Sequence, residues 1–379
     1  MSRRSSFINN IITLLITVLA VFVVVFVADG RYGSGAQDFF QQVTFMDMVI
    51  YLIIGALLSG FICTLVHELG HVIFGKANGF DFLSMTVWFF KLSKINGKFK
   101  FNFVMMGDSA GSTEMIPKHT ENLEKRFKNM TMGGIFLSSF LILIGVAVMI
   151  FNLSSMPLYC VFAMFLPIGL YCLFGNLLPV AEGGVMNDGA VLQGLKRQTD
   201  SVKVALGILA IHSQMYNGKT PAEIDEKLYF DLPQLPEDDL NFAILLNARY
   251  AYYLDKGDYE NAKKVLERFL SLEDYLPKSY LYVGKAEALY AACTFDYNED
   301  VADDLMYELE KYLNKNNGAA EIRTKLAYIL FVTGEDAAFD TFYKKGLREA
   351  NKCQLKGYGL YERKLLESIK AQVENSSAK

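Results

Sequence analysis

The sequence predicts a mainly α-helical protein: a polytopic membrane helix bundle with a small cytoplasmic β-hairpin, followed by an α-helical hairpin repeat domain. Three observations lead to this fold class. Of the 379 residues, 52% are hydrophobic, and the long apolar runs all lie before residue 195. A lysine-rich segment of alternating pattern interrupts those runs, and amphipathic patterns with spaced turn residues follow them. The length suits roughly two or three domains.

Four runs are apolar enough and long enough to cross a bilayer, which takes roughly 20 helical residues. They are residues 7–28, 46–74, 130–151 and 156–178. The first follows two arginines, as a signal peptide would, but its apolar core is longer than that of a signal peptide and no clear cleavage site follows. We therefore expect residues 1–45 to form a membrane helix with an external loop, and residues 46–195 to form a membrane-embedded core.

Basic residues set the expected orientation. Residues 76–128 contain nine Lys or Arg, two more precede the first run and two follow the fourth, whereas the other connections contain only Arg31. By the positive-inside rule, the N-terminus, residues 76–128 and residues 196–379 are cytoplasmic. We expect an integral protein of a bacterial cell membrane, in contact with the lipid bilayer.

The stretch LVHELGH, residues 65–71, places three ionisable side chains within the second run. His67 and His71 are one helical turn apart, the spacing with which two imidazoles bind one zinc ion, and Glu68 can reach a metal-bound water. A purely structural pair of histidines is the alternative, but an ionisable residue inside a span is itself a reason to expect a functional site. The histidines belong to a stripe of small residues that lets another backbone or a substrate approach: Gly60, Thr64, His67, His71 and Gly75.

A catalytic zinc needs three protein ligands and one open position. The third ligand is expected in GNLLPVAEGGVMNDG, residues 175–189, where Asp188 is the first candidate and Glu182 its rival. A loop carboxylate without a metal role is the alternative. If helical, His67 and Asp188 both lie roughly 12–13 Å from the basic cytoplasmic flank. His119 and His212, in a polar stretch and in the C-terminal region, are poor candidates.

These motifs resemble the site-2 protease family of intramembrane zinc metalloproteases. The resemblance rests on HELGH in a membrane helix, followed two spans later by Asn-x-x-Pro at Asn176 and by Asp-Gly at Asp188. FGKANGFDFLSMTVWF and LEKRFKNMTMGGIFLSS resemble further family segments, so that the likeness covers roughly residues 46–195. Two features depart from the family pattern: residues 180–187 lengthen the second motif, and Gly133-Gly134 with Ser138 and Ser139 replaces a usual Gly-Pro and asparagine.

The resemblance implies a three-helix core in which His67, His71 and Asp188 hold one zinc ion per chain. Glu68 would activate the water as general base. Asn176, or a backbone N–H near Gly183, would stabilise the oxyanion or position the substrate.

Residues 84–104 are expected to form two strands joined at Asn96-Gly97, a hairpin turn signal. In the second strand, Phe99, Phe101 and Phe103 alternate with polar residues. Two interpretations stay open: an edge strand that holds a substrate extended, or a hairpin on the membrane surface.

Residues 196–379 contain turn residues that recur about every 39 positions between amphipathic helical patterns. The turns lie at Gly218, at Gly257, near Phe295 and at Gly334. The pattern resembles a degenerate tetratricopeptide array, with Ala262 at a small packing position. Such an array offers a concave face for a cytoplasmic protein partner, and a compact helical cap without a partner is the alternative.

The expected function is that of a zinc metalloendopeptidase that cuts a membrane protein or peptide in or near a transmembrane segment. The alternative is a catalytically inactive membrane scaffold that recruits partners through its repeats. A net charge of −4 without a basic stripe gives no reason to expect a nucleic-acid partner. Five cysteines without CxxC spacing predict neither a disulfide framework nor a thiolate zinc site.

Overall fold

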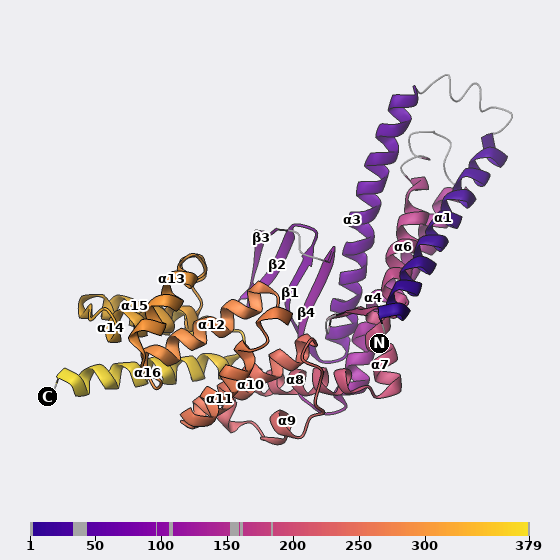
Figure 1. The fold of residues 1–379 in the computed structure, drawn as a ribbon. Helices are drawn as coiled ribbons and strands as arrows, with labels where there is room; N and C mark the ends of the chain where they lie inside the picture. Colours follow the sequence, from indigo (N-terminus) through magenta and orange to yellow (C-terminus); the bar gives the residue numbers. More distant parts are fainter. Residues whose placement is uncertain are drawn as a thin grey trace. The chain divides into compact units, whose positions relative to one another are not determined.

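The computed structural model describes residues 3–32, 44–95, 97–105, 109–151, 159, 162–182 and 185–377. It is mostly helical with a small antiparallel sheet, and the chain forms two compact units (Figure 1). Unit 1 comprises residues 1–115 with 122–198, and unit 2 comprises residues 116–121 with 199–379. The expected domain boundary after residue 195 falls inside a helix. That helix ends two residues later, at Arg197.

Unit 1 contains three helices that are long and apolar enough to cross a membrane, in segments Ser6–Val27, Phe45–Ala77 and Leu123–Val148. They belong to α1 (Arg3–Tyr32), α3 (Phe45–Ala77) and α4 (Leu123–Phe151). The fourth expected span, 156–178, lies partly outside the described residues. Its described part includes α6 (Phe165–Leu177), an apolar helix of 13 residues, which packs against α1, α3 and α4.

Helices α3 and α4 meet at two glycines. A Cβ atom added to Gly70 would lie 2.3 Å from the carbonyl oxygen of Gly133, and one added to Gly133 would lie 2.4 Å from that of Gly70. Only residues without a side chain allow so close a crossing of two backbones. This contact brings the residues that follow Gly133 on α4 against the HELGH face of α3.

The sheet has four strands in the order β3-β2-β1-β4. These are β1 (Phe80–Val87), β2 (Phe90–Ile95), β3 (Lys98–Phe103) and β4 (Gly111–Pro117). The expected hairpin is present as β2 and β3, whose register pairs Ile95 with Lys98. Gly97 in its turn has φ +76°, and Asn96 lies outside the described residues.

The first expected strand of that hairpin was wrong in its extent. A turn at Trp88 and Phe89 divides residues 80–95 into β1 and β2, and β4 was not expected at all. Trp88 has φ +55°, a left-handed conformation that its residue type does not signal. Tertiary contacts hold it: its N–H donates to the Ala110 carbonyl at 2.7 Å, and its ring lies against Gly60.

Unit 1 ends with the two-residue strands β5 (Ala181–Glu182) and β6 (Val185–Met186), followed by helix α7 (Asp188–Arg197). After the last turn of α7, Gln198 has a left-handed φ of +52° that ends the helix. The main part of unit 2 begins at the next residue, Thr199.

Unit 2 is built from antiparallel helical hairpins, as the repeated turn residues predicted. The pairs α10/α11, α12/α13 and α14/α15 pack internally, and α16 packs against α14, α15 and α8. A glycine follows the helix at three of these turns, at Gly218, Gly257 and Gly334. Each has a positive φ, the left-handed conformation typical of the residue after a helix C-terminus. The helices are α8 (Asp200–Tyr216), α9 (Lys227–Phe230), α10 (Leu240–Lys256), α11 (Tyr259–Leu270), α12 (Lys278–Cys293), α13 (Glu299–Lys315), α14 (Ala319–Phe331), α15 (Phe339–Lys352) and α16 (Lys356–Ser377).

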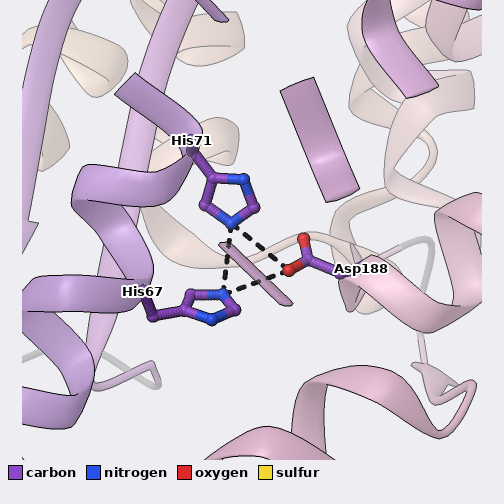
Figure 2. Close-up of side chains that lie close together, drawn as sticks. All are labelled: His67, His71 and Asp188. Atoms are coloured by element: carbon purple, nitrogen blue, oxygen red, sulfur yellow. Dashed lines mark hydrogen bonds and ion pairs between the residues drawn. The ribbon is translucent and has the colours of Figure 1, made fainter. Parts of the chain in front are cut away.

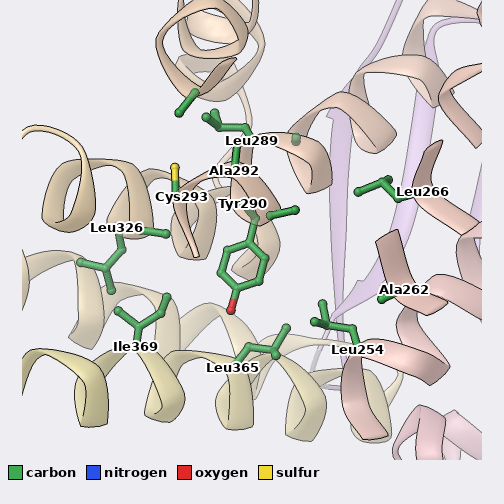
Figure 3. Packing of buried hydrophobic residues seen from close by; sticks show 14 of the residues in the cluster. Leu254, Ala262, Leu266, Leu289, Tyr290, Ala292, Cys293, Leu326, Leu365 and Ile369 are labelled. Atoms are coloured by element: carbon green, nitrogen blue, oxygen red, sulfur yellow. The ribbon is translucent and has the colours of Figure 1, made fainter. Parts of the chain in front are cut away.

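The core of the hairpins joins residues from α10 to α16 (Figure 3). Ala262 is fully buried in it, in agreement with the expected small packing position. An ionic cluster is buried beside this apolar core: the Arg323 guanidinium contacts Glu287 at 2.6 Å and Glu362 at 2.8 Å. Charged side chains buried away from solvent are tolerated only when they are paired in this way.

Candidate metal centre

Two helices bring three ligand atoms to one point (Figure 2). His67 and His71 project from α3, and Asp188 is the first residue of α7. The Oδ2 atom of Asp188 lies 3.1 Å from Nε2 of His67 and 3.2 Å from Nε2 of His71, and the two Nε2 atoms are 3.1 Å apart. These are the same three residues that the sequence predicts as ligands.

The outer nitrogens of both imidazoles have partners on α4. Nδ1 of His71 lies 3.1 Å from the Met130 carbonyl oxygen, and Nδ1 of His67 lies 3.0 Å from the Ser138 hydroxyl. A carbonyl can only accept, so His71 donates from Nδ1, and its Nε2 carries a lone pair when the ring is neutral. Such outer hydrogen bonds are typical of metal-binding histidines.

The inner atoms of the cluster therefore suit a cation. Oδ2 of Asp188 is buried and makes no hydrogen bond of good geometry with the described residues, although both imidazoles are close. A carboxylate oxygen and an imidazole lone pair repel one another unless a proton or a metal ion lies between them. Two imidazoles and one carboxylate are a donor set that suits zinc, so the residues present fit the expected ion.

Glu68 lies beside the cluster and is held from β4. The Thr113 hydroxyl donates to Oε2 of Glu68 at 2.6 Å, and the Glu68 side chain is buried. A Cβ atom on Gly111 would lie 2.5 Å from Oε1 of Glu68, so the β4 backbone passes directly over this carboxylate. We expected another backbone to approach the stripe of small residues on α3. β4 makes such an approach, because a Cβ atom on Gly111 would also lie 2.7 Å from Cγ2 of Thr64 in that stripe.

Helix α4 covers the histidines with a second glycine. A Cβ atom on Gly134 would lie 2.5 Å from Nε2 of His71 and 2.8 Å from Cε1 of His67. Gly133 thus sets the helix crossing, and Gly134 leaves room for the ligands. This is a physical reason for the Gly-Gly pair at this position.

Asp188 owes its position to the residue before it. The Asn187 side chain donates to the carbonyls of Gly175 at 2.6 Å and of Leu178 at 2.7 Å, at the end of α6. Its Oδ1 accepts from Val180 N–H and, as the N-cap of α7, from Ala190 N–H. One side chain thus ties the start of α7 to the end of α6.

Residues 180–187, which lengthen the second motif relative to the family pattern, do not carry Asp188 away from the histidines. Strands β5 and β6 pair antiparallel, and Asn187 N–H donates to the Val180 carbonyl at 3.1 Å, so the segment folds back on itself. Gly189 then allows α7 to pack closely, because a Cβ atom there would lie 2.2 Å from the Leu177 carbonyl oxygen. Helix α1 supports the loop, since the Asn9 amide donates to the Pro179 carbonyl at 2.6 Å.

The other expected site residues do not join the cluster in the described structure. The Asn176 amide donates to the Cys172 carbonyl within its own helix at 3.0 Å, so its role near the oxyanion stays a prediction. Glu182 belongs to β5, but its side chain, like Gly183, lies outside the described residues. His119 pairs with Glu121, and His212 lies on α8 in unit 2.

Sequence reasoning missed three contributors to the site. Ser138 was noted only as a departure from the family pattern, and its contact with Nδ1 of His67 was not expected. Asn187 carried a usable signal, because asparagine before an Asp-Gly helix start is a typical N-cap. Thr113 had no local signal, since its role depends on β4 lying over Glu68.

The chain matches no model of a protein family, no curated protein and no solved structure.

Proposed function

We propose that this chain is a membrane-embedded zinc metalloendopeptidase that cuts peptide bonds in or near transmembrane segments. The observation that supports it best is the convergence of His67, His71 and Asp188 within 4.8 Å, with Glu68 one residue away from the first histidine. The three helices of membrane length support a site buried within the bilayer. In this proposal the N-terminus and unit 2 are cytoplasmic, as the basic residues predict.

His67, His71 and Asp188 would hold the ion, whose binding lowers the pKa of a water molecule and polarises the scissile carbonyl. Glu68 takes the proton of the attacking water and gives it to the leaving amine. The Thr113 hydroxyl, at 2.6 Å, fixes one Glu68 oxygen and leaves the other for the water. Burial of Glu68 strengthens its electrostatic interactions with the reacting groups.

The free edge of β4 is the proposed substrate site. β4 is the last strand of the sheet, and none of the described strands pairs with its outer side. An unwound substrate could extend the sheet there through main-chain hydrogen bonds. Because Gly111 of β4 lies against Glu68, the added strand would pass beside the general base.

The opposite edge of the sheet fits the second interpretation of the hairpin. Phe99, Phe101 and Phe103 on β3 are exposed, Phe103 by 72%, and Lys98 and Lys100 lie on either side of Phe99. Aromatic and basic side chains together favour the membrane–water interface. We therefore assign β3 to the membrane surface and β4 to the substrate.

The test uses the full chain purified in detergent, with zinc content and cleavage of a model transmembrane substrate as readouts. Glu68→Gln should keep the zinc and reduce cleavage by roughly 10²–10⁴-fold, the usual contribution of a general base. Glu124→Gln is the matched control, because Glu124 is an exposed residue of α4 outside the cluster and outside β4, and accepts from the Gln198 amide instead. Equal cleavage by the Glu68 variant and the parent would rule out the mechanism.

A second pair of variants decides the third ligand. Asp188→Ala should remove the zinc, whereas Glu182→Ala should keep it. A chain that binds no zinc and cuts no substrate would instead support the inactive scaffold, whose function would depend on unit 2.

A further inference from the structure

Helix α1 contains polar side chains inside its apolar segment, Ser6–Val27. Such side chains are costly in a membrane helix and usually have a specific partner. The hydroxyls of Thr13 and Thr17 donate to carbonyls of their own helix, at Asn9 and Thr13 respectively. Ser6 and Asn9 instead reach residues outside α1, so these two side chains need a different explanation.

Both side chains bind one edge of the chain at strand β5. The Asn9 amide donates to the Pro179 carbonyl at 2.6 Å. The Ser6 hydroxyl donates to the Ala181 carbonyl at 3.3 Å and lies 3.4 Å from the Ala181 nitrogen, whose N–H it accepts. Ser6 and Asn9 are three residues apart and share one face of α1, and their partners are two residues apart on one edge of an extended segment.

The opposite edge of the same segment is bound by Asn187, the residue before Asp188. The Val180 N–H donates to Oδ1 of Asn187 at 2.9 Å, and the Val180 carbonyl accepts from the Asn187 N–H at 3.1 Å. Successive residues of an extended chain direct their backbone groups to opposite edges. Residues 179–182 and 185–187, which we call the ligand loop, are therefore bonded to α1 on one edge and closed on themselves along the other.

Helix α1 takes the place of a third strand. Among the described strands, β5 pairs with β6 alone. Backbone N–H and C=O groups within a bilayer find no water and must be bonded inside the protein. Ser6 and Asn9 supply these bonds on the side of β5 that faces away from β6. The main contacts of α1 are with α6 and β5, so this edge links the helix to the metal centre.

We propose that α1 is a clamp on the ligand loop and that Asn9 is a positioning residue for Asp188. Asn9 and Ser6 hold the outer edge of β5, the loop holds Asn187, and Asn187 starts the helix whose first residue is Asp188. A displacement of α1 loosens the third ligand, which makes this helix a control point of the site. The effect on the ion rests on the proposed zinc site, whereas the clamp on the loop does not.

The test compares Asn9→Leu with Asn10→Leu in the full chain in detergent. Leucine has the branched shape of asparagine and suits lipid, but it cannot donate a hydrogen bond to the Pro179 carbonyl. Asn10 is the matched control, because it is the next residue of α1 and its side chain is exposed.

Two measurements separate the loop from the ion. Hydrogen–deuterium exchange, read by mass spectrometry of overlapping peptides, reports the amides of Val180, Ala181 and Asn187. Competition with a chromogenic chelator gives the zinc affinity, and circular dichroism reports the helices.

Asn9→Leu should raise the exchange rate of these amides about tenfold, because loss of one buried hydrogen bond shifts a local opening equilibrium by roughly that much. Zinc affinity should also fall about tenfold, the low end for loss of an outer-shell partner. Asn10→Leu should match the parent in both measurements. Asn9→Gln keeps an amide donor and should lie closer to the parent than Asn9→Leu does. If Asn9→Leu misfolds, Ser6→Ala replaces it and should raise exchange about threefold, since its two hydrogen bonds are longer.

The proposal is overturned if the folded clamp variant exchanges its loop amides like the parent, if Asn10→Leu has the same effect, or if Asn9→Gln is as impaired as Asn9→Leu. Faster exchange with the zinc affinity of the parent would refute the positioning of Asp188. A parent chain that binds no zinc would overturn the proposed function instead, and amide exchange in the variants would still decide whether α1 clamps the loop.

Discussion

Replacing Gly134 by alanine should weaken metal binding strongly while leaving the helices folded. The added methyl carbon would lie 2.5 Å from Nε2 of His71, and contacts must widen to at least 3.4 Å to become ordinary. The imidazole cannot simply rotate away, because its Nδ1 is hydrogen-bonded to the Met130 carbonyl on the same helix, α4. A retreat of α4 would remove that hydrogen bond from the ring as well.

The expected loss follows from this displacement. Metal sites work when their ligands are held within roughly 0.5 Å of the productive geometry. The added methyl group would force the His71 imidazole to move farther than that. We expect zinc affinity to fall at least 10–100-fold, about as much as when an outer-shell partner is lost. Competition with a chromogenic chelator measures the affinity, and circular dichroism reports the helices.

Gly175→Ala on α6 is the matched control, because a Cβ atom there meets nothing within 4 Å. It should keep full zinc affinity, and the helix should gain about 0.5–1 kcal/mol of stability. A folded Gly134→Ala chain with the zinc affinity of the parent would refute the reasoning, since the ligand atoms would then lie elsewhere.

Three other changes test the support of the site and of unit 2. Asn187→Ala removes the hydrogen bonds that tie α7 to α6 and should weaken zinc binding at least tenfold, measured with the same chelator. Arg323→Met strands two buried carboxylates and should lower the free energy of unfolding of unit 2 by about 3–5 kcal/mol in denaturant titrations. Burial lowers the pKa of His212, so the unfolded state gains its proton first as pH falls below about 6.5, and stability should drop there. His212→Gln should flatten that part of the pH profile.

The sequence was sufficient for the parts of the fold whose signals are local. Apolar runs located α1, α3 and α4. Spaced glycines such as Gly257, which has a positive φ in the structure, located the turns of the helical hairpins. The division of residues 80–95 into two strands was missed because Trp88 is held in a left-handed conformation by tertiary contacts. Local propensity cannot report a conformation that distant residues impose.

The site shows the same division between local and distant information. The spacing of His67 and His71 on one helix face is a local property, and it placed two candidate ligands. The third was harder, because eight residues lie between Pro179 and Asp188 and sequence alone does not show where they go. Strands β5 and β6 supply the answer, since they close the segment on itself and return the chain to the end of α6.

The two histidines are not equivalent, and this gives a last prediction. Nδ1 of His71 faces a carbonyl, which can only accept, whereas Nδ1 of His67 faces the Ser138 hydroxyl, which can donate or accept. The Met130 carbonyl therefore fixes the tautomer of His71, while Ser138 fixes only the orientation of the His67 ring. Ser138→Ala should weaken zinc binding about tenfold, at the low end for an outer-shell partner, and Ser138→Asn should restore much of it.

If Ser138→Ala removed the zinc entirely, the hydroxyl would be setting the tautomer of His67 as well. If Ser139→Ala, the control on the neighbouring residue whose hydroxyl bonds its own helix at Ile135, had the same effect as Ser138→Ala, the loss would reflect α4 packing and not the contact with His67.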